Sequence, residues 1–508
     1  MRGPDGRTGR AGGSTRRTPR GQARARPPDA GRPPARTPTP GPALRRRGGG
    51  PPPPPPPPGA AGAAPPPPRP PPPPPRAAAG RAPPLPPTAL QTRLWRRERT
   101  HPAVATGSHA LRLTGPLDPQ RLTEALTGVL RRHEALRTRL VRSTSDQPRL
   151  HVDEEPVLRL TRADLSAFTP QAAAERTALQ LTESASTVLD LESGRTSAFR
   201  LLRTAPDEHV LILASHLAVF DGWSSGVFLA DLAAGYREGP EGLTAPELQF
   251  PDYADWQHRW LAGPDGTAEL TRRRTVFAAD PPAPRAPGGF ERGHLPVRLA
   301  RGPVDAGLEL GAAEGATPFM TLLAALAVVL ARRDGRGSVV IGTPAAGRFA
   351  APLEGAVGQY TTVVPIRLDL AGGPTFRELL HRTRSAVAEA LAHQRLPVDV
   401  LFGDGTPPPY NVLFALHNYP AVPLDLPGIE VGQLPGPPAR HLELYSPDPA
   451  AALACVGLVE RDGEIGGTAE YNRHAATPED VRGLLTGIEE VLDRAVAAPA
   501  SPLTTTRH

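Results

Sequence analysis

The sequence predicts an α+β protein of two lobes, preceded by a low-complexity tail. Three observations lead to this fold class. The first 84 residues contain few apolar side chains, whereas the following 424 have an ordinary globular composition. A folded part of that length exceeds what one hydrophobic core usually holds, so two lobes are expected. Finally, helix and strand signals mix without a strict βαβ order, which favours α+β sandwiches over a parallel sheet.

The tail, residues 1–84, is rich in proline, arginine and glycine, with proline runs at 51–58, 65–68 and 70–75. Such a segment cannot bury enough apolar surface to offset its chain entropy, so we expect disorder with polyproline II stretches. Only Met1 and Met320 are methionines. A start codon other than ATG near residue 84 therefore stays open as an alternative, in which the tail is translated upstream sequence.

The positive charge of the chain resides in this tail. Residues 1–84 contain 16 arginines and 2 aspartates, a net charge of +14, while the whole chain carries +7. Residues 85–508 therefore carry a net charge of −7. A mildly acidic folded part argues against nucleic acid as its partner.

Composition also excludes several other classes. The longest apolar stretch, Phe319 to Ala331, is shorter than the ~20 residues that span a bilayer. The single cysteine, Cys455, excludes internal disulfides and cysteine metal clusters, and its apolar surroundings indicate packing. We expect a cytoplasmic monomer without a membrane partner, a metal or a cofactor of its own.

Helix starts are marked by capping residues followed by proline. Asp118, Thr317 and Thr477 each precede a proline and a stretch with apolar residues at helical spacing. The helix after Thr317 is expected to end before Asp334-Gly335. Further along the chain, Ser224 or Ser225 is expected to cap a helix that ends near Gly239.

Strand signals are β-branched or alternating runs at 110–113, 209–214, 338–341, 361–368 and 411–416. The region around 261–305 is rich in proline, arginine and glycine, as a crossover between lobes would be. We therefore divide the folded part into a first lobe at 85–260, a crossover at 261–305, a second lobe at 306–496 and a short tail at 497–508.

The most informative segment, Ser215 to Ser224, reads S-H-L-A-V-F-D-G-W-S. Other segments accompany it: Q-T-R-L-W at 91–95, R-H-E-A-L-R-T at 132–138, D-Y-A-D-W at 252–256, I-G-T-P-A-A-G-R at 341–348, G-Q-Y-T-T-V-V-P-I-R at 358–367 and H-Q-R-L-P at 393–397. Together, over roughly residues 85–496, they resemble the condensation-domain family. These proteins are acyltransferases of nonribosomal peptide assembly lines, and their signature is H-H-x-x-x-D-G.

The resemblance implies two lobes, each like chloramphenicol acetyltransferase, that meet in a V with a tunnel between them. It also implies attack by an amine or hydroxyl on a thioester. The chain has no recognisable carrier site or adenylation module, so a stand-alone protein is expected. Its substrates would arrive on the phosphopantetheine of separate acyl or peptidyl carrier proteins.

The chain departs from the family pattern at the catalytic position. Aligned without gaps, His216 takes the place of the first histidine and Leu217 that of the second, which is the catalytic one in the family; Thr362 replaces a usual asparagine. Because successive strand side chains point to opposite faces, Leu217 should face the tunnel and His216 the lobe interior. A one-residue bulge that exchanges the two remains the alternative.

Asp221 and Gly222 complete the candidate catalytic set with His216. In the family the aspartate forms a structural salt bridge, for which Arg348 is the first candidate partner here and Arg137 the second. Gly222 either serves the turn or offers its N–H to an oxyanion at a helix start.

Two functions follow from these residues. The first is a stand-alone condensation enzyme of nonribosomal peptide or antibiotic biosynthesis that forms an amide or an ester. The second is a non-catalytic module that docks carrier proteins or recruits another enzyme, which Leu217 and Thr362 favour. A role of the tail in binding nucleic acid or SH3-type partners rests on composition alone.

Overall fold

The computed structural model describes residues 84–101, 105–403, 405–417, 424–434 and 440–503. The predicted tail therefore lies outside the described residues except for Pro84, and the last five residues of the chain also lie outside them. The two-lobed α+β fold predicted from the sequence is confirmed, with one mixed sheet in each lobe.

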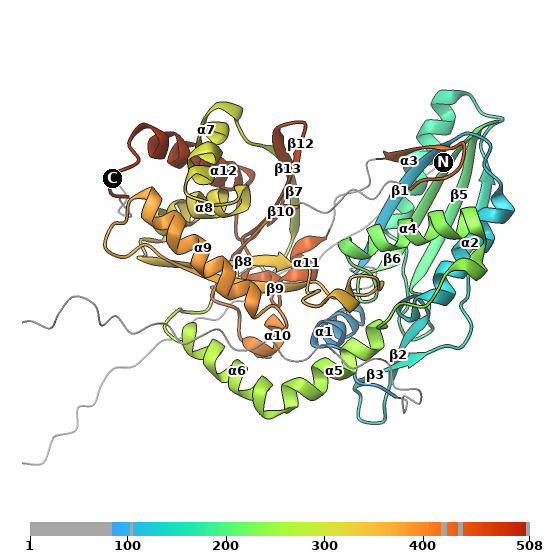
Figure 1. The fold of residues 1–508 in the computed structure, drawn as a ribbon, viewed down its shortest axis with the longest axis horizontal. Coiled ribbons are helices and arrows are strands. Elements are labelled where there is room, and N and C mark those ends of the chain that lie inside the picture. Colours follow the sequence, from blue (N-terminus) through green and yellow to red (C-terminus); the bar gives the residue numbers. More distant parts are fainter. Residues whose placement is uncertain (1–83, 102–104, 404, 418–423, 435–439, 504–508) are drawn as a thin grey trace, which may run out of the picture. The chain divides into compact units, whose positions relative to one another are not determined.

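The first lobe contains a five-stranded sheet in the order β11-β1-β6-β5-β4, in which only β4 and β5 pair in parallel. Helix α3 packs on one face, and α2 and α4 cover the other (Figure 1). The bounds are β1 Thr106–Thr114, α2 Pro119–Arg132, β4 Leu160–Asp164, α3 Pro170–Ala185, β5 Ser197–Ala205, β6 Glu208–His216, α4 Gly222–Glu238 and β11 Glu430–Leu434.

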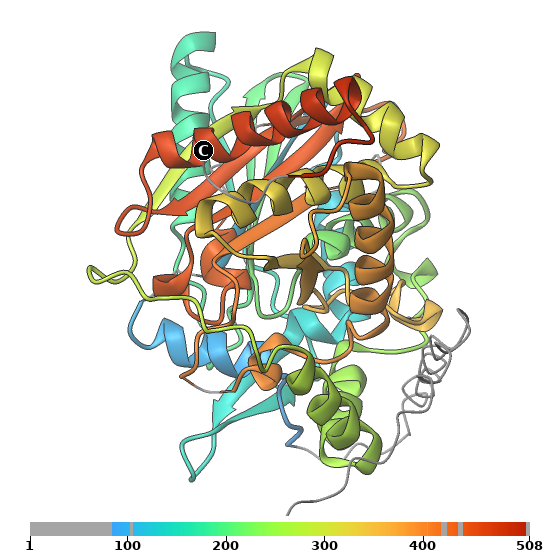
Figure 2. The same ribbon diagram turned by 90° about the vertical axis from the view of Figure 1, so that its left-hand side faces the viewer.

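The second lobe contains a six-stranded sheet in the order β7-β13-β12-β10-β8-β9. Helices α7, α8, α9 and α12 gather over one face of it, as the view onto this lobe shows (Figure 2). The bounds are β7 Arg292–Arg298, α7 Arg301–Ala313, α8 Pro318–Asp334, β8 Ser338–Ala345, β9 Thr362–Asp369, α9 Phe376–Ala392, β10 Val412–His417, β12 Ala454–Arg461, β13 Glu464–Asn472 and α12 Pro478–Ala497.

The remaining elements lie outside the two large sheets, and β2 and β3 among them pair antiparallel as a separate two-stranded sheet. They are α1 Ala89–Glu98, η1 Glu134–Arg137, β2 Thr138–Arg142, β3 Pro148–Val152, η2 Pro240–Gly242, α5 Phe250–Ala262, α6 Pro264–Val276, η3 Ala351–Leu353, α10 Val398–Leu401, α11 His441–Tyr445 and η4 Pro449–Ala451. One buried apolar cluster runs from the face under α2 and α4 to residues of the second sheet such as Leu413 and Cys455. The lobes thus share a core.

The helices that begin after Asp118, Thr317 and Thr477 start where the capping signals predict them. Asp118 Oδ1 accepts hydrogen bonds from the N–H groups of Gln120 and Arg121 at the start of α2. Thr317 and Thr477 cap α8 and α12 in the same way. Helix α8 ends at Asp334 and is capped by Gly335, whose φ of 64° is the left-handed conformation that glycine adopts at little cost.

The chain crosses between lobes more than its composition predicts. Strand β11 lies within 306–496, which the sequence assigns to the second lobe, yet it pairs with β1 of the first sheet. The region 261–305 holds α6, strand β7 of the second sheet and the start of α7.

Among the described residues, no single helix is long and apolar enough to cross a membrane. Helices α7 and α8 meet that test only together, as a pair bent by 112°. Most side chains of α8 are buried in the core of the second lobe, as expected of a core helix.

Candidate functional site

The motif segment links strand β6 to helix α4 through a tight turn at residues 217–221. Asp221 is the N-cap of α4, and its Oδ1 accepts from the N–H of Ser224 at 2.8 Å. The expectation that Ser224 or Ser225 caps this helix is therefore wrong, because the carboxylate of Asp221 takes that role one turn earlier. Gly222 is the exposed first residue of α4 and is not among the residues with positive φ, so the turn does not require a glycine there.

His216 is fully buried in the first lobe. Its Nδ1 accepts a hydrogen bond from the N–H of Ala218 at 2.9 Å, so Nε2 is the protonated nitrogen. That Nε2 lies 2.8 Å from Oε1 of Glu98 on α1, although the two atoms are not aligned as a hydrogen bond. Both ring nitrogens therefore face protein groups.

Leu217 has the opposite environment. Within residues 209–221 it is the one side chain that is not buried. Its N–H donates to the carbonyl of Ala105 at 2.7 Å, which holds the backbone in place. Its side chain lies over Gly107 of β1, where an added Cβ would stand 3.2 Å from Leu217 Cδ2. The turn thus presents Leu217 and hides His216, as strand alternation without a bulge predicts.

Asp221 and Arg348 form a bidentate ion pair in the interior. Nη1 of Arg348 donates to Oδ2 at 2.7 Å and Nη2 to Oδ1 at 3.1 Å, and both side chains are 1% exposed. Burial alone would raise the pKa of Asp221, but the charge and hydrogen bonds of Arg348, with those from Ser224, lower it below its ordinary value. The aspartate is therefore ionised and fully paired.

The second lobe contributes a segment, residues 354–361, that binds around this ion pair. The N–H groups of Tyr360 and Thr361 donate to Oδ2 of Asp221 at 3.0 and 3.2 Å. The N–H of Gly358 donates to Oγ of Ser224 at 3.0 Å. In its alternative amide orientation, Gln359 donates to the carbonyls of Leu217 and Phe220. The turn at residues 217–221, which we call the motif turn, and segment 354–361 therefore form one hydrogen-bonded unit across the two lobes.

Arg137, the second candidate partner of Asp221, has other contacts. It donates to the carbonyl of Asp153 and lies 3.7 Å from Glu134. The neighbouring His133 is fully buried, with Nε2 2.6 Å from Asp231 of α4 and Nδ1 accepting from the N–H of Val357 at 3.3 Å. His133 thus contacts both α4 and segment 354–361.

Other segments of the recognised pattern contact this turn or the loop that carries Arg348. Gln91 of α1 donates to the carbonyl of Ala218 at 3.0 Å. Gln394 accepts from the N–H of Gly347 at 3.2 Å. Gly347 has a φ of 68°, and a Cβ there would lie 1.9 Å from the carbonyl oxygen of Tyr360. Only glycine fits beside Arg348, so this residue type follows from the packing.

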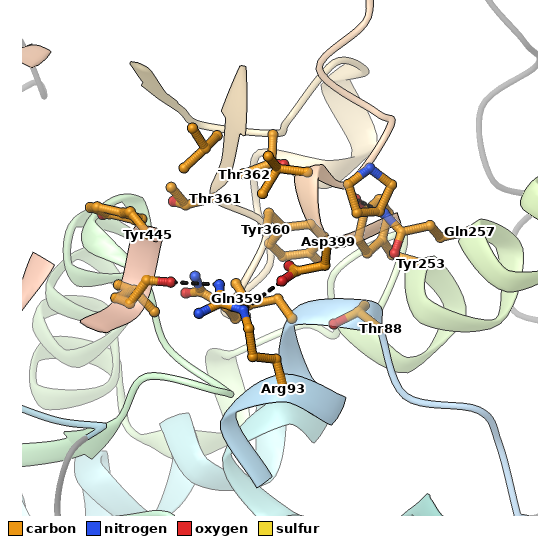
Figure 3. Close-up of a pocket in the computed structure, with 15 residues that line it drawn as sticks. Thr88, Arg93, Tyr253, Gln257, Gln359, Tyr360, Thr361, Thr362, Asp399 and Tyr445 are labelled. Carbon is orange, nitrogen blue, oxygen red and sulfur yellow. Dashed lines mark hydrogen bonds and ion pairs between the residues drawn. The ribbon is translucent and has the colours of Figure 1, made fainter. Parts of the chain in front are cut away.

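A small cavity of about 30 Å³, the space of a single water molecule, is lined by Tyr360 and Thr361 of segment 354–361 (Figure 3). Figure 3 shows Arg93 of α1 and Asp399 of α10 at its edge, joined at 2.5 Å. Thr362, which replaces the usual asparagine, lines this cavity with Gln359.

Metal and thiol chemistry find no support at the described positions. No group of three or more histidine, cysteine or acidic side chains there could hold a metal ion. Cys455 is buried, and desolvation raises the pKa of its thiol well above the ordinary value. It is therefore a packing residue, as the sequence predicts.

Sequence reasoning missed three features of this region. Glu98 pairs with His216, Ser224 bridges Asp221 and segment 354–361, and His109 of β1 lines a larger cavity beside the motif. Glu98 and His109 lie in no recognised motif, so no local sequence pattern predicted their positions.

Comparison with known proteins identifies the family. The condensation-domain family model matches residues 84–507. Malpinin synthetase of Mortierella alpina is 32% identical over 411 residues, which cover 76% of this chain and 5% of that protein. Phosphinothricin tripeptide synthetase PhsC of Streptomyces viridochromogenes is 32% identical over 442 residues, which cover 82% of this chain and 39% of that protein. The match thus spans a minor part of either relative.

Among solved structures, the X-domain from teicoplanin biosynthesis superposes with a TM-score of 0.73 at 27% identity, covering 85% of this chain and 99% of that one. A complex of that X-domain with OxyB matches with a TM-score of 0.69 at 26% identity, covering 85% of this chain and 98% of that one.

Proposed function

Because this chain belongs to the condensation-domain family, we propose that it transfers a carrier-bound acyl or aminoacyl group to an amine or hydroxyl in nonribosomal peptide biosynthesis. Its partners would be acyl or peptidyl carrier proteins, which bring the substrates on phosphopantetheine. The observation that carries this proposal is the intact framework of the motif turn, with Asp221 paired to Arg348 and both enclosed by the second lobe.

The reaction forms a bond between the attacking nitrogen or oxygen and the carbonyl carbon and breaks the carbon–sulfur bond. The phosphopantetheine thiolate leaves and takes up the proton that the nucleophile loses. A histidine at position 217 would relay that proton, an effect of roughly 10²–10⁴-fold, but leucine has no atom for it. His216 cannot substitute, since both of its nitrogens face Ala218 and Glu98.

The catalysis left to this chain is positional. Holding the nucleophile beside the thioester lowers the barrier without any proton transfer by a side chain. The exposed Gly222 begins α4, where N–H groups lack intrahelical partners and the helix dipole favours negative charge. These N–H groups are the candidates for stabilising the oxyanion of the tetrahedral intermediate.

The test uses a donor and an acceptor aminoacyl group, each loaded on its own carrier protein. Product is quantified by mass spectrometry with wild type, with Leu217→His and without protein. Product above the protein-free control, increased by Leu217→His, is the expected result. No product from either protein, under conditions in which both are folded, would refute the proposal.

The second candidate function is a non-catalytic docking module. Two observations favour it: Leu217 removes the proton acceptor, and the chain is similar to the teicoplanin X-domain, which was solved in complex with OxyB. Under this hypothesis, the chain binds carrier proteins with measurable affinity, and Leu217→His yields no product. Titration of a labelled carrier protein, run beside the transfer assay, separates the two functions.

A further inference from the structure

A second, larger cavity lies beside the motif turn. Its volume is about 440 Å³, within the range of small-molecule sites. Phe220 of the motif turn and Phe228 of α4 line it but are almost fully buried. The exposed residues of the lining are His109 on β1, Gln433 on β11 and Arg461 at the end of β12. A ligand in this cavity therefore contacts polar side chains that come from both sheets.

The cavity lies close to the position that the motif turn presents. A Cβ added to Gly107 of β1 would stand 3.2 Å from Cδ2 of Leu217. His109 follows Gly107 by two residues, so the two positions share one face of β1 and are about 7 Å apart along the strand. A group bound at His109 therefore lies within reach of a short chain that starts beside Leu217.

Arg461 brings a positive charge to the cavity. Among the described residues that line it, Arg461 alone carries a fixed charge and none is acidic. The residue opposite Arg461 in the pairing of β12 with β13 is Glu464, whose carboxylate lies 3.1 Å from Arg298 instead. The guanidinium of Arg461 has no hydrogen bond or ion pair with any described residue. Because this group only donates, it is available to an anion.

Two further side chains add hydrogen-bond donors to the same cavity. Gln433 lies opposite Leu111 in the pairing of β11 with β1, and His109 precedes Leu111 by two residues on the same strand face. Neither the amide of Gln433 nor the ring of His109 has a hydrogen-bond partner among the described residues. The amide offers two N–H groups, and the imidazole offers at least one in either protonation state. Donors from three residues thus line the cavity without a carboxylate beside them.

A carboxylate on the acyl group fits these donors. A guanidinium binds a carboxylate or a phosphate through two parallel hydrogen bonds, so the donors alone do not choose between the two anions. Position favours the carboxylate, because under the proposed function the thioester reacts at the motif turn. The phosphate of phosphopantetheine lies at the far end of the arm from the thioester, whereas the cavity lies beside the turn. The partly buried Leu229 and Leu434 suit the methylene groups of an acidic side chain.

We propose that this cavity binds a carboxylate on the acyl or aminoacyl substrate, held by Arg461 together with Gln433 and His109. The substrate class is then an acidic acyl group, such as glutaryl or glutamyl. The assignment rests on the proposed acyl-transfer function and names its substrate class. Under it, Arg461 is a specificity residue that touches the substrate, separate from the chemistry at the thioester.

The experiment measures binding without turnover. The probes are amides of N-acetylethylenediamine with glutaric, glutaramic and pentanoic acids, which are stable analogues of the thioesters, and they are titrated into the full chain by calorimetry. The glutaryl probe should bind about three- to tenfold more tightly than the neutral glutaramyl probe, between the effect of an exposed ion pair and that of a charged hydrogen bond. This preference should shrink as salt is raised from about 0.05 to about 0.5 M, since ions screen an exposed pair. Inorganic phosphate should displace the glutaryl probe only weakly.

Matched variants locate the contact. Arg461→Met should abolish the preference for the carboxylate, and Arg461→Lys, which keeps the charge without the planar fork, should retain part of it. Gln433→Leu should weaken binding of the glutaryl probe. Arg112→Met is the control for net charge, because Arg112 is an exposed arginine of β1 that does not line the cavity. Melting temperature is measured for every variant.

The outcomes separate this inference from the proposed function. Equal affinity for the glutaryl and glutaramyl probes, or a preference that survives in Arg461→Met, would overturn the role of Arg461. Phosphate that binds through Arg461 more tightly than the glutaryl probe would overturn the acidic acyl class and assign the cavity to a phosphate. Absence of binding by any probe, together with carrier-dependent product formation, would overturn the cavity assignment alone. Selective binding without product formation would support the cavity and refute acyl transfer.

Discussion

Replacing Asp221 by alanine is the most direct perturbation of the site. The substitution removes the carboxylate that accepts from both Nη atoms of Arg348 and leaves a charge that is 1% exposed without its ionic partner, although Ser224 Oγ and the carbonyl of Ala356 still accept from the guanidinium. It also removes the acceptor of the N–H groups of Ser224, Tyr360 and Thr361. Breaking a buried ion pair by removing one partner typically costs about 3–5 kcal/mol. The free energy of unfolding of Asp221→Ala should fall by at least that range, because the orphaned N–H groups add to it.

Equilibrium unfolding in urea, followed by tryptophan fluorescence, measures this loss. A control variant is Glu464→Ala, which removes a surface ion pair with Arg298 in which the side chains are 45% and 72% exposed. Exposed pairs of this kind contribute about 0–1 kcal/mol. The two variants therefore delete the same chemical group and differ in burial.

A double variant, Asp221→Ala with Arg348→Met, tests the mechanism of the loss. If the cost comes from an unpaired buried guanidinium, removing that charge as well should recover part of the stability. The reasoning fails if Asp221→Ala is no more destabilising than Glu464→Ala. It fails equally if the double variant loses the full sum of the two single losses.

Other residues give four shorter predictions. Leu217→His should raise product formation in the carrier assay by up to roughly 10²–10⁴-fold, whereas His216→Ala should act mainly on stability, costing about 1–3 kcal/mol for the unpaired Ala218 N–H and Glu98 in a denaturation experiment. Gly347→Ala should destabilise more than Gly335→Ala, since both have positive φ but only the former meets an atom at 1.9 Å, and their melting temperatures give the comparison. Burial raises the pKa of Glu470 to about 7 from the ordinary 4.5. The stability that this carboxyl contributes should therefore be fully present below pH 4.5 and be lost as the pH rises through 7. In Glu470→Gln the free energy of unfolding should depend less on pH over this range.

The parts of the fold predicted from sequence are those set by local chemistry. Asp118, Thr317 and Thr477 cap helices because an oxygen one residue before the first turn satisfies its free N–H groups. The strands β6 and β8 follow runs of β-branched and other apolar residues that suit a buried sheet. Each of these signals lies within a few residues of the structure that it specifies.

The features that sequence reasoning missed depend on contacts between distant residues. Strand β11 has five residues, a central glycine and no alternation of burial, so nothing local assigns it to the first sheet rather than the second. Glu98 and His216 are 118 positions apart and meet only because α1 packs under the motif turn. The pairing of Asp221 with Arg348 was expected, but from the family resemblance and not from spacing.

The contrast between His216 and Leu217 lies in how strongly the fold constrains the two positions. Substitution at 216 would remove two contacts in a fully buried site, whereas the side chain at 217 is the least constrained in the turn. The backbone of Leu217 is held by its N–H and carbonyl, which any residue type supplies. The side chain of Leu217 is only partly buried at the edge of the core, so a histidine there should cost less stability than a substitution at the fully buried position 216. For this reason Leu217→His is expected to fold like wild type, which makes it a clean test of proton transfer at this turn.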